Sequence, residues 1–98
     1  MTERIHTMTR ADVRFFAGAA HAFGTDSQFV QFEGDTLGDL LEALRSGAIS
    51  EAGPDAGEVL GRCSFLVNAV SENDPKARLV ASEGGTIRVD VLPPFAGG

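Results

Sequence analysis

The sequence predicts an α+β domain in which one amphipathic helix packs against one face of a small mixed sheet. Short segments near both ends of the chain, residues 11–17 and 86–92, alternate apolar with polar side chains, as strands with one buried face do. Between them, four leucines repeat at helical spacing and form one apolar stripe: Leu37, Leu40, Leu41 and Leu44. Because such a helix cannot bury its stripe alone, it must cross a sheet.

The first half of the chain supplies a hairpin and this helix. Residues 11–17 and residues 28–32 are predicted as antiparallel strands, and the Gly- and Ala-rich residues 18–26 as the loop that connects them. The helix begins after Gly34, where Asp35 or Thr36 suits its N-cap. Asp39 in the first turn, and Arg45 and Gly47 at the end, match the usual start and stop signals: acidic, basic and glycine.

The second half is predicted to hold a short helix and two further strands. Pro54 suits a first helical position, and Val59 and Leu60 close this helix. Residues 63–70 read as a buried strand, followed by a polar, turn-prone stretch over 71–76. Gly84 and Gly85 provide a turn before the last strand, residues 86–92.

The element order by itself specifies only an α+β domain with one main helix on one sheet. A hairpin, a right-handed helical crossover and a last strand beside the first would close such a sheet naturally. That arrangement is the β-grasp, the ubiquitin-like fold. We expect a polar, flexible leader over residues 1–10, the β-grasp domain over residues 11–92 and an extended tail over residues 93–98.

Composition restricts the partners and the compartment. The chain has 98 residues and a net charge of −6, which argues against binding to a phosphate backbone. No apolar run approaches the ~20 residues of a membrane helix. Cys63 is the only cysteine, so no intramolecular disulfide is possible, and the first ten residues lack a signal-peptide core. We expect a cytoplasmic protein that binds neither nucleic acid nor membrane.

No group of side chains in the sequence assembles an active site. The glycines around residues 18–24 lack the Lys and Ser or Thr of a nucleotide loop, and His6 and His21 lack ligand partners at metal-site spacing. Cys63 heads an apolar strand and fits a core position. Capping and solvation explain the acidic residues around the main helix: Asp35, Asp39 and Glu42. We therefore predict no catalytic side chain, no metal site and no permanently bound cofactor.

The tail carries the functional signal. Pro93 and Pro94 must stop the last strand and hold the following chain extended, because proline lacks the N–H of a sheet ladder. Gly97 and Gly98 have no side chain to collide with a narrow channel, and they leave a terminal carboxylate sterically bare. A free carboxylate is a poor electrophile until it is activated, for example as an acyl-adenylate. The tail therefore suits insertion into the active site of another protein.

The segment Pro93-Pro94-Phe95-Ala96-Gly97-Gly98 resembles the C-terminal signature of the MoaD/ThiS family of ubiquitin-like sulfur carriers. Weaker similarity covers residues 13–17, 36–44 and 65–68, with Ala69 where the family often has Gly after Val-Asn. The double proline makes the chain most similar to the small subunit of molybdopterin synthase. This resemblance implies the β-grasp fold and a hetero-oligomer with the large subunit of that enzyme.

The resemblance also implies a chemistry for the tail. A ubiquitin-activating-type adenylyltransferase would use ATP to place a transient AMP on Gly98, and a sulfur donor protein would convert the adenylate to a thiocarboxylate. Gly97 would thread the channel of the large subunit, while Phe95 and Ala96 would line its mouth. Pro93 and Pro94 would stiffen the arm.

An exposed apolar docking surface is a further expectation, formed by Phe16 and Leu92.

Three other functions stay open at this point. The same carrier chemistry feeds cysteine, thiamine, tRNA thiolation or specialised metabolites in related proteins. A ubiquitin-like modifier would instead form isopeptide bonds, and Lys76, the only lysine, makes this chain a poor platform for polymeric chains. In a plain interaction domain the tail would be dispensable.

Overall fold

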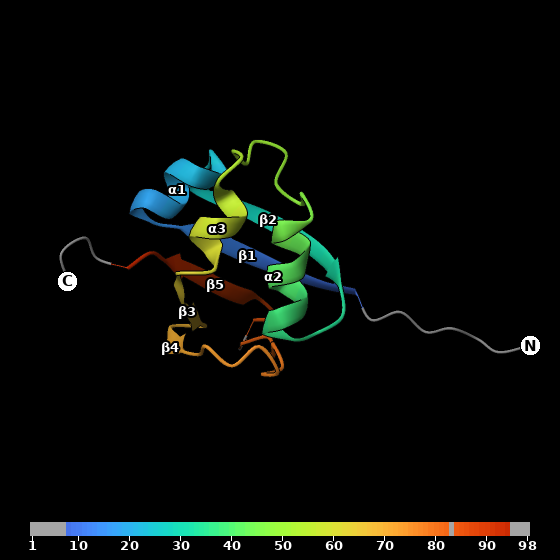
Figure 1. Cartoon of the computed structure of the whole chain (residues 1–98). Helices are drawn as coiled ribbons and strands as arrows, with labels where there is room; N and C mark the ends of the chain where they lie inside the picture. Colours follow the sequence, from blue (N-terminus) through green and yellow to red (C-terminus); the bar gives the residue numbers. More distant parts are fainter. Residues whose placement is uncertain (1–7, 83, 95–98) are drawn as a thin grey trace, which may run out of the picture.

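The computed structural model describes residues 8–82 and 84–94 of the chain. Within these ranges, five strands form one sheet in the order β2-β1-β5-β3-β4, and the helices lie on one face of that sheet (Figure 1). The elements are β1 (Met8–Phe15), α1 (Ala17–Phe23), β2 (Ser27–Glu33), α2 (Leu37–Arg45), α3 (Ala56–Leu60), β3 (Ser64–Val67), β4 (Val70–Ser71) and β5 (Ile87–Leu92).

The strand directions confirm the predicted closure of the sheet. β1 and β2 form an antiparallel hairpin at one edge of the sheet, and the chain then crosses through α2 and α3 to β3 and β4 at the opposite edge. β5 returns to the centre, where it pairs parallel to β1 and antiparallel to β3. This is the ubiquitin-like β-grasp, so the predicted fold class is confirmed.

The core lies between the sheet and the helices. The predicted stripe of α2 is buried at Leu37, Leu40 and Leu44, and Leu41 packs against the core from its margin. The buried apolar side chains are Ala11, Val13, Phe15, Ala19, Phe23, Val30, Phe32, Leu37, Leu40, Leu44, Ile49, Ala56, Leu60, Phe65, Leu79, Ile87, Val89 and Val91.

The start of α2 is fixed by a capping box. Thr36 is the N-cap, and its hydroxyl oxygen accepts from the Asp39 N–H at 3.1 Å. The Asp39 carboxylate in turn accepts from the Thr36 N–H at 3.1 Å and from the Asp35 N–H at 3.0 Å. Gly34 has φ +107°, and an added Cβ would collide with that carboxylate. The glycine and the cap together set the angle at which β2 passes into α2.

The predicted loop over residues 18–26 is wrong, because this stretch contains helix α1. Its alanines are good helix formers, and it buries Ala19 and Phe23. The Phe23 ring stacks on that of Phe15, with ring centroids 4.6 Å apart. Gly24 ends the helix in the left-handed conformation, at φ 73°. Two buried positions in seven residues were too few to show a helical period in the sequence.

The predicted strand over residues 63–70 is also wrong in part. It is a hairpin in which β3 and β4 flank a two-residue turn at Asn68 and Ala69, with φ 50° and 72°. The Asn68 side chain strengthens this turn because its amide donates to the Val80 carbonyl and its carbonyl oxygen accepts from the Arg88 N–H, both at 2.9 Å. A polar residue inside an apolar run therefore marked the turn.

Several boundaries differ from those expected. The first strand ends at Phe15 instead of residue 17, because Ala17 opens α1, and β2 and β5 differ by a single residue at their ends. β1 begins at Met8, so residues 8–10 of the expected leader belong to the sheet; residues 1–7 lie outside the described chain. The short helix closes at Leu60 as predicted, but Asp55 is its N-cap, so Pro54 precedes the helix instead of opening it.

Candidate functional site

The tail leaves the sheet at a defined place. β5 runs parallel to β1 and ends with it, because Val91 is the register partner of Phe15. The strand stops at Leu92, which pairs with Ser64 of β3, and Pro93 and Pro94 follow outside the sheet. The predicted stop at the double proline is therefore confirmed.

The remaining tail residues, Phe95, Ala96, Gly97 and Gly98, lie outside the described part of the chain. Their expected roles as the modified and channel-binding positions stay predictions.

Phe16 and Leu92 lie beside this exit. The Phe16 N–H donates to the Val91 carbonyl at 3.2 Å, which brings the residue after β1 against the end of β5. The Phe16 side chain is 40% exposed, and Leu92 is half-buried. A hollow of about 330 Å³ opens next to Phe16, between the end of β1 and the start of β2. The two residues thus share one end of the sheet with the tail, and their docking role stays a prediction.

The face of the sheet away from the helices, here called the open face, carries charged side chains from its two central strands. The Arg14 guanidinium pairs with the Asp12 carboxylate at 3.0 Å, and Arg88 pairs with Asp90 at 2.9 Å. The hydrogen bonds and the charge of Asp12 raise the pKa of Arg14. Both pairs lie side by side, because Arg14 and Asp90 are register partners of β1 and β5.

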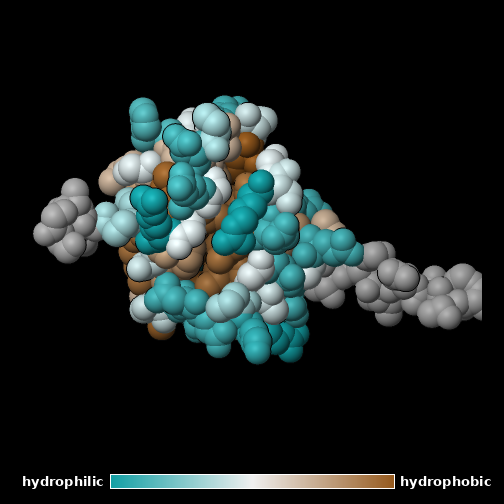
Figure 2. All heavy atoms as spheres, in the orientation of Figure 1, coloured by the Kyte–Doolittle hydropathy of each residue, from teal (hydrophilic) through white to brown (hydrophobic). Residues whose placement is uncertain are grey.

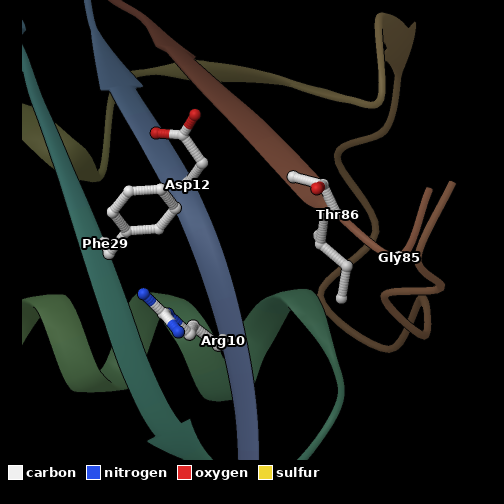
Figure 3. Close-up of a pocket in the computed structure, with 6 residues that line it drawn as sticks. Arg10, Asp12, Phe29, Gly85 and Thr86 are labelled. Atoms are coloured by element: carbon white, nitrogen blue, oxygen red, sulfur yellow. The ribbon is translucent and has the colours of Figure 1, made fainter.

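A second hollow on the open face was not predicted. It has a volume of about 270 Å³ and lies between the start of β5 and the pair formed by Arg10 and Phe29 (Figure 3). The Arg10 guanidinium lies over the Phe29 ring, 4.9 Å from its centroid. The sequence places Arg10 in the expected leader, and only the short alternation of Met8 and Arg10 with Thr9 and Ala11 indicates a strand there.

Cys63 lies on the other side of the molecule and is not set up as a nucleophile. Its thiol donates to the Val59 carbonyl at 3.2 Å, and burial raises the pKa of the thiol. It lines a groove of about 450 Å³ between α2 and the start of β3, together with Leu41 and Leu60. Figure 2 shows apolar surface among hydrophilic side chains on the helical side of the molecule. Burial therefore favours the protonated thiol over the thiolate.

The described ranges contain neither a metal site nor a membrane-spanning helix. In residues 8–82 and 84–94, His, Cys, Asp and Glu side chains form no group of three that suits a metal ion. No helix in the same ranges has the length and hydropathy to cross a membrane.

The sheet order, the crossover and the exit of β5 beside β1 define a ubiquitin-like β-grasp protein. No protein-family model and no curated protein matches the sequence. Solved structures do match the fold. The crystal structure of SAMP1 from Haloferax volcanii is 24% identical, covers 92% of this chain and 100% of its own, and superposes with a TM-score of 0.69.

Two further structures share the fold. The complex of subunits 1 and 2 of molybdopterin-converting factor from Helicobacter pylori contains a chain that is 22% identical, with a TM-score of 0.60 over 92% of this chain and 100% of that one. The solution structure of the small archaeal modifier protein SAMP1 from Methanosarcina acetivorans is 22% identical, with a TM-score of 0.64 over 94% and 99%. The fold expected from the resemblance to MoaD/ThiS carriers is thereby confirmed.

Proposed function

We propose that this chain is a ubiquitin-like sulfur carrier whose Gly98 is adenylated and then converted to a thiocarboxylate, and that it donates this sulfur as the small subunit of molybdopterin synthase. The observation that carries the proposal is the exit of β5: the strand ends at Leu92, and Pro93 and Pro94 continue outside the sheet beside exposed Phe16. A rigid domain with an extended arm is the form that a carrier needs.

The proposed chemistry takes place on the arm, in the active sites of partners. A carboxylate oxygen of Gly98 attacks the α-phosphorus of ATP, and pyrophosphate leaves. The outer sulfur of a persulfide on a donor protein then attacks the acyl carbon and displaces AMP. A second thiol attacks the resulting acyl disulfide, so that the S–S bond breaks, the thiocarboxylate is released and the two thiols are left joined as a disulfide. Gly97 and Gly98 leave the acyl carbon accessible in these steps because neither has a side chain.

The domain would supply the docking energy for these steps. Phe16 and Leu92 offer apolar contact area within a few residues of the arm, so a partner that covers them also receives the tail. The proposed partners are an adenylyltransferase of the ubiquitin-activating type and the large subunit of molybdopterin synthase. The structural neighbour from Helicobacter pylori is itself one chain of a two-subunit complex, which supports a hetero-oligomer here.

The intact mass of the protein tests this proposal. The full chain, shown by mass to end at Gly98, is incubated with ATP, the activating enzyme and a sulfur donor. We expect a gain equal to the exchange of one oxygen for sulfur, located at Gly98 by fragmentation. Deletion of Gly98 should abolish the gain, whereas Gly57→Ala, a change into open space on α3, should keep it. An unchanged mass with an enzyme that charges another carrier would contradict a carrier role.

The acceptor is tested separately, because related carriers serve several pathways. The charged protein is offered to the large subunit and to acceptors from cysteine, thiamine and tRNA thiolation systems. Transfer to the large subunit alone supports the molybdopterin synthase role, and transfer to another acceptor would replace that pathway while keeping the carrier chemistry.

A ubiquitin-like modifier is the second candidate function, because two of the matching structures are described as small archaeal modifier proteins. In this case an amine of a target would displace AMP from Gly98 and form an isopeptide bond. The test is a denaturing gel after incubation with ATP and extract. Conjugates of higher mass that resist thiol reagents would favour the modifier.

A further inference from the structure

The outer edge of β2 offers free main-chain hydrogen-bonding groups. The Phe15 N–H donates to the Asp26 carbonyl at 2.8 Å, and this fixes which residues of β2 face β1. Because alternate residues of an antiparallel pair are hydrogen-bonded, Gln28, Val30 and Phe32 bond to β1, while Phe29 and Gln31 direct their N–H and C=O outward. No described residue accepts from the Phe29 or Gln31 N–H, while the Phe29 carbonyl accepts from the neighbouring Gln28 side-chain amide at 3.5 Å.

This edge lacks the features that usually protect an edge strand. β2 ends the sheet, is seven residues long and contains neither proline nor lysine, and its one charged residue is the last, Glu33. Natural sheets discourage pairing at such an edge with lysine, proline or a bulge. The strand is therefore open to the addition of another extended segment.

The positively charged side chain of Arg10 lies next to the same edge. Arg10 is the register partner of Gln31, and its guanidinium reaches over the Phe29 ring (Figure 3). The other two arginines of the open face, Arg14 and Arg88, are paired with carboxylates, whereas Arg10 contacts no carboxylate within the described chain. Among the described residues, the Arg10 charge is thus held by an aromatic ring and meets no carboxylate.

We propose that an extended acidic segment of a partner protein pairs with the outer edge of β2 and places a carboxylate on Arg10. The outward N–H groups of Phe29 and Gln31 and the Gln31 carbonyl would bond to the main chain of the segment, and the Phe29 carbonyl would exchange its contact with the exposed Gln28 amide for one with the segment. The guanidinium already lies over β2, and an added strand would lie ~4.8 Å beyond it, within reach of a glutamate side chain. A second copy that paired through its own β2 would offer a single carboxylate, that of Glu33 at the end of the strand, which favours an acidic segment of another protein. This site goes beyond the proposed function, since it uses neither the tail nor Gly98.

The probe is a blocked hexapeptide of alternating valine and glutamate, titrated into the ¹⁵N-labelled full chain. We expect saturable amide shifts that centre on Phe29 and Gln31. A matched peptide with lysine in place of glutamate should bind at least roughly threefold more weakly, the scale of an exposed ion pair. Arg10→Gln should remove this preference, and Arg62→Gln, an exposed arginine on the helical side, should leave it intact.

A second pair of measurements tests the strand pairing itself. Gln31→Pro removes only an outward N–H, so it should block peptide binding while the spectrum stays dispersed. If that variant fails to fold, a glutamate peptide N-methylated at every second residue serves instead and should lose binding on its blocked edge. Absence of shifts at millimolar peptide, or shifts away from β2, would overturn the proposal. Shifts that depend on protein concentration without peptide would overturn it too and assign the edge to a second copy. None of these outcomes depends on sulfur transfer.

Discussion

The two faces of the sheet are built from the same strands but differ in character: one is buried in the core and the other is a charged surface. On the face under the helices, Val13 of β1 and Val89 of β5 are fully buried. On the open face, the alternate residues of these strands are charged and form the Arg14–Asp12 and Arg88–Asp90 pairs. Since successive side chains of a strand point to opposite faces, one short segment specifies both the core and a surface. The cost of a substitution should therefore follow the face and not the strand.

Removal of a core side chain under α2 is expected to give the largest effect. Leu40 is fully buried, so Leu40→Ala should lower the free energy of unfolding by about 2–5 kcal/mol through lost burial and the remaining cavity. Phe29→Ala on the open face is the control, because this larger side chain is 58% exposed and should cost much less. Urea denaturation measures both. Equal losses would show that the two faces do not differ as described.

The cap of α2 is expected to contribute less and to depend on pH. The Thr36 N–H, followed by the Thr36 hydroxyl and the Asp35 N–H, lowers the pKa of Asp39 in the folded protein. Asp39→Ala should cost about 1 kcal/mol at neutral pH. Because the folded pKa lies below the unfolded one, this contribution is present above the unfolded pKa and lost as the pH falls through the folded pKa.

Denaturation at a series of pH values checks this sign. The stability difference between the wild type and Asp39→Ala should be constant near neutrality and shrink in acid. Glu42→Gln, an exposed change on the same helix, is the control. A difference that grows in acid would contradict the capping role of the carboxylate.

The sequence predicted the parts of the fold whose hydrophobic pattern repeats over several residues or whose end is marked by proline. The leucine stripe of α2 and the alternation of β5 are such patterns, and the double proline after Leu92 defined where the sheet ends. α1 was missed because its small residues give no strong period. The turn at Asn68 and Ala69 has only one sequence signal, the polar Asn68 inside an apolar run, and it was missed because no glycine accompanies that residue, although both residues have positive φ.

The sites show the same limit. The tail was found from its own residues, whereas the Arg10–Phe29 hollow joins residues that are far apart in the sequence. Only the register of β1 with β2 brings them together, and that register depends on how two separate strands and the segment between them fit, which neither strand shows by itself. The exit of the tail beside Phe16 likewise follows from the parallel pairing of β1 and β5.

Relief of strain in the β3–β4 turn should stabilise the protein. Ala69 has φ 72°, a conformation that costs an L-residue about 1–2 kcal/mol and costs glycine little. Ala69→Gly should therefore raise the free energy of unfolding by up to about 1 kcal/mol, after the entropic cost of glycine. Ala43→Gly, the same change inside α2, should lower it by about 1 kcal/mol. Equal signs in the two variants would contradict the turn geometry.

The smallest loss of unfolding free energy is expected for Arg10→Gln. Arg10 belongs to the open face, and its guanidinium contacts an aromatic ring instead of a carboxylate. Its contact with Phe29 is exposed, so its loss should cost about 0.5 kcal/mol. Thermal and urea denaturation of Arg10→Gln, with Arg62→Gln as the exposed control, measure this cost. A loss near that of Leu40→Ala would mean that Arg10 supports the fold. A small loss would leave recognition at the edge of β2 as the role that the Arg10 charge can serve.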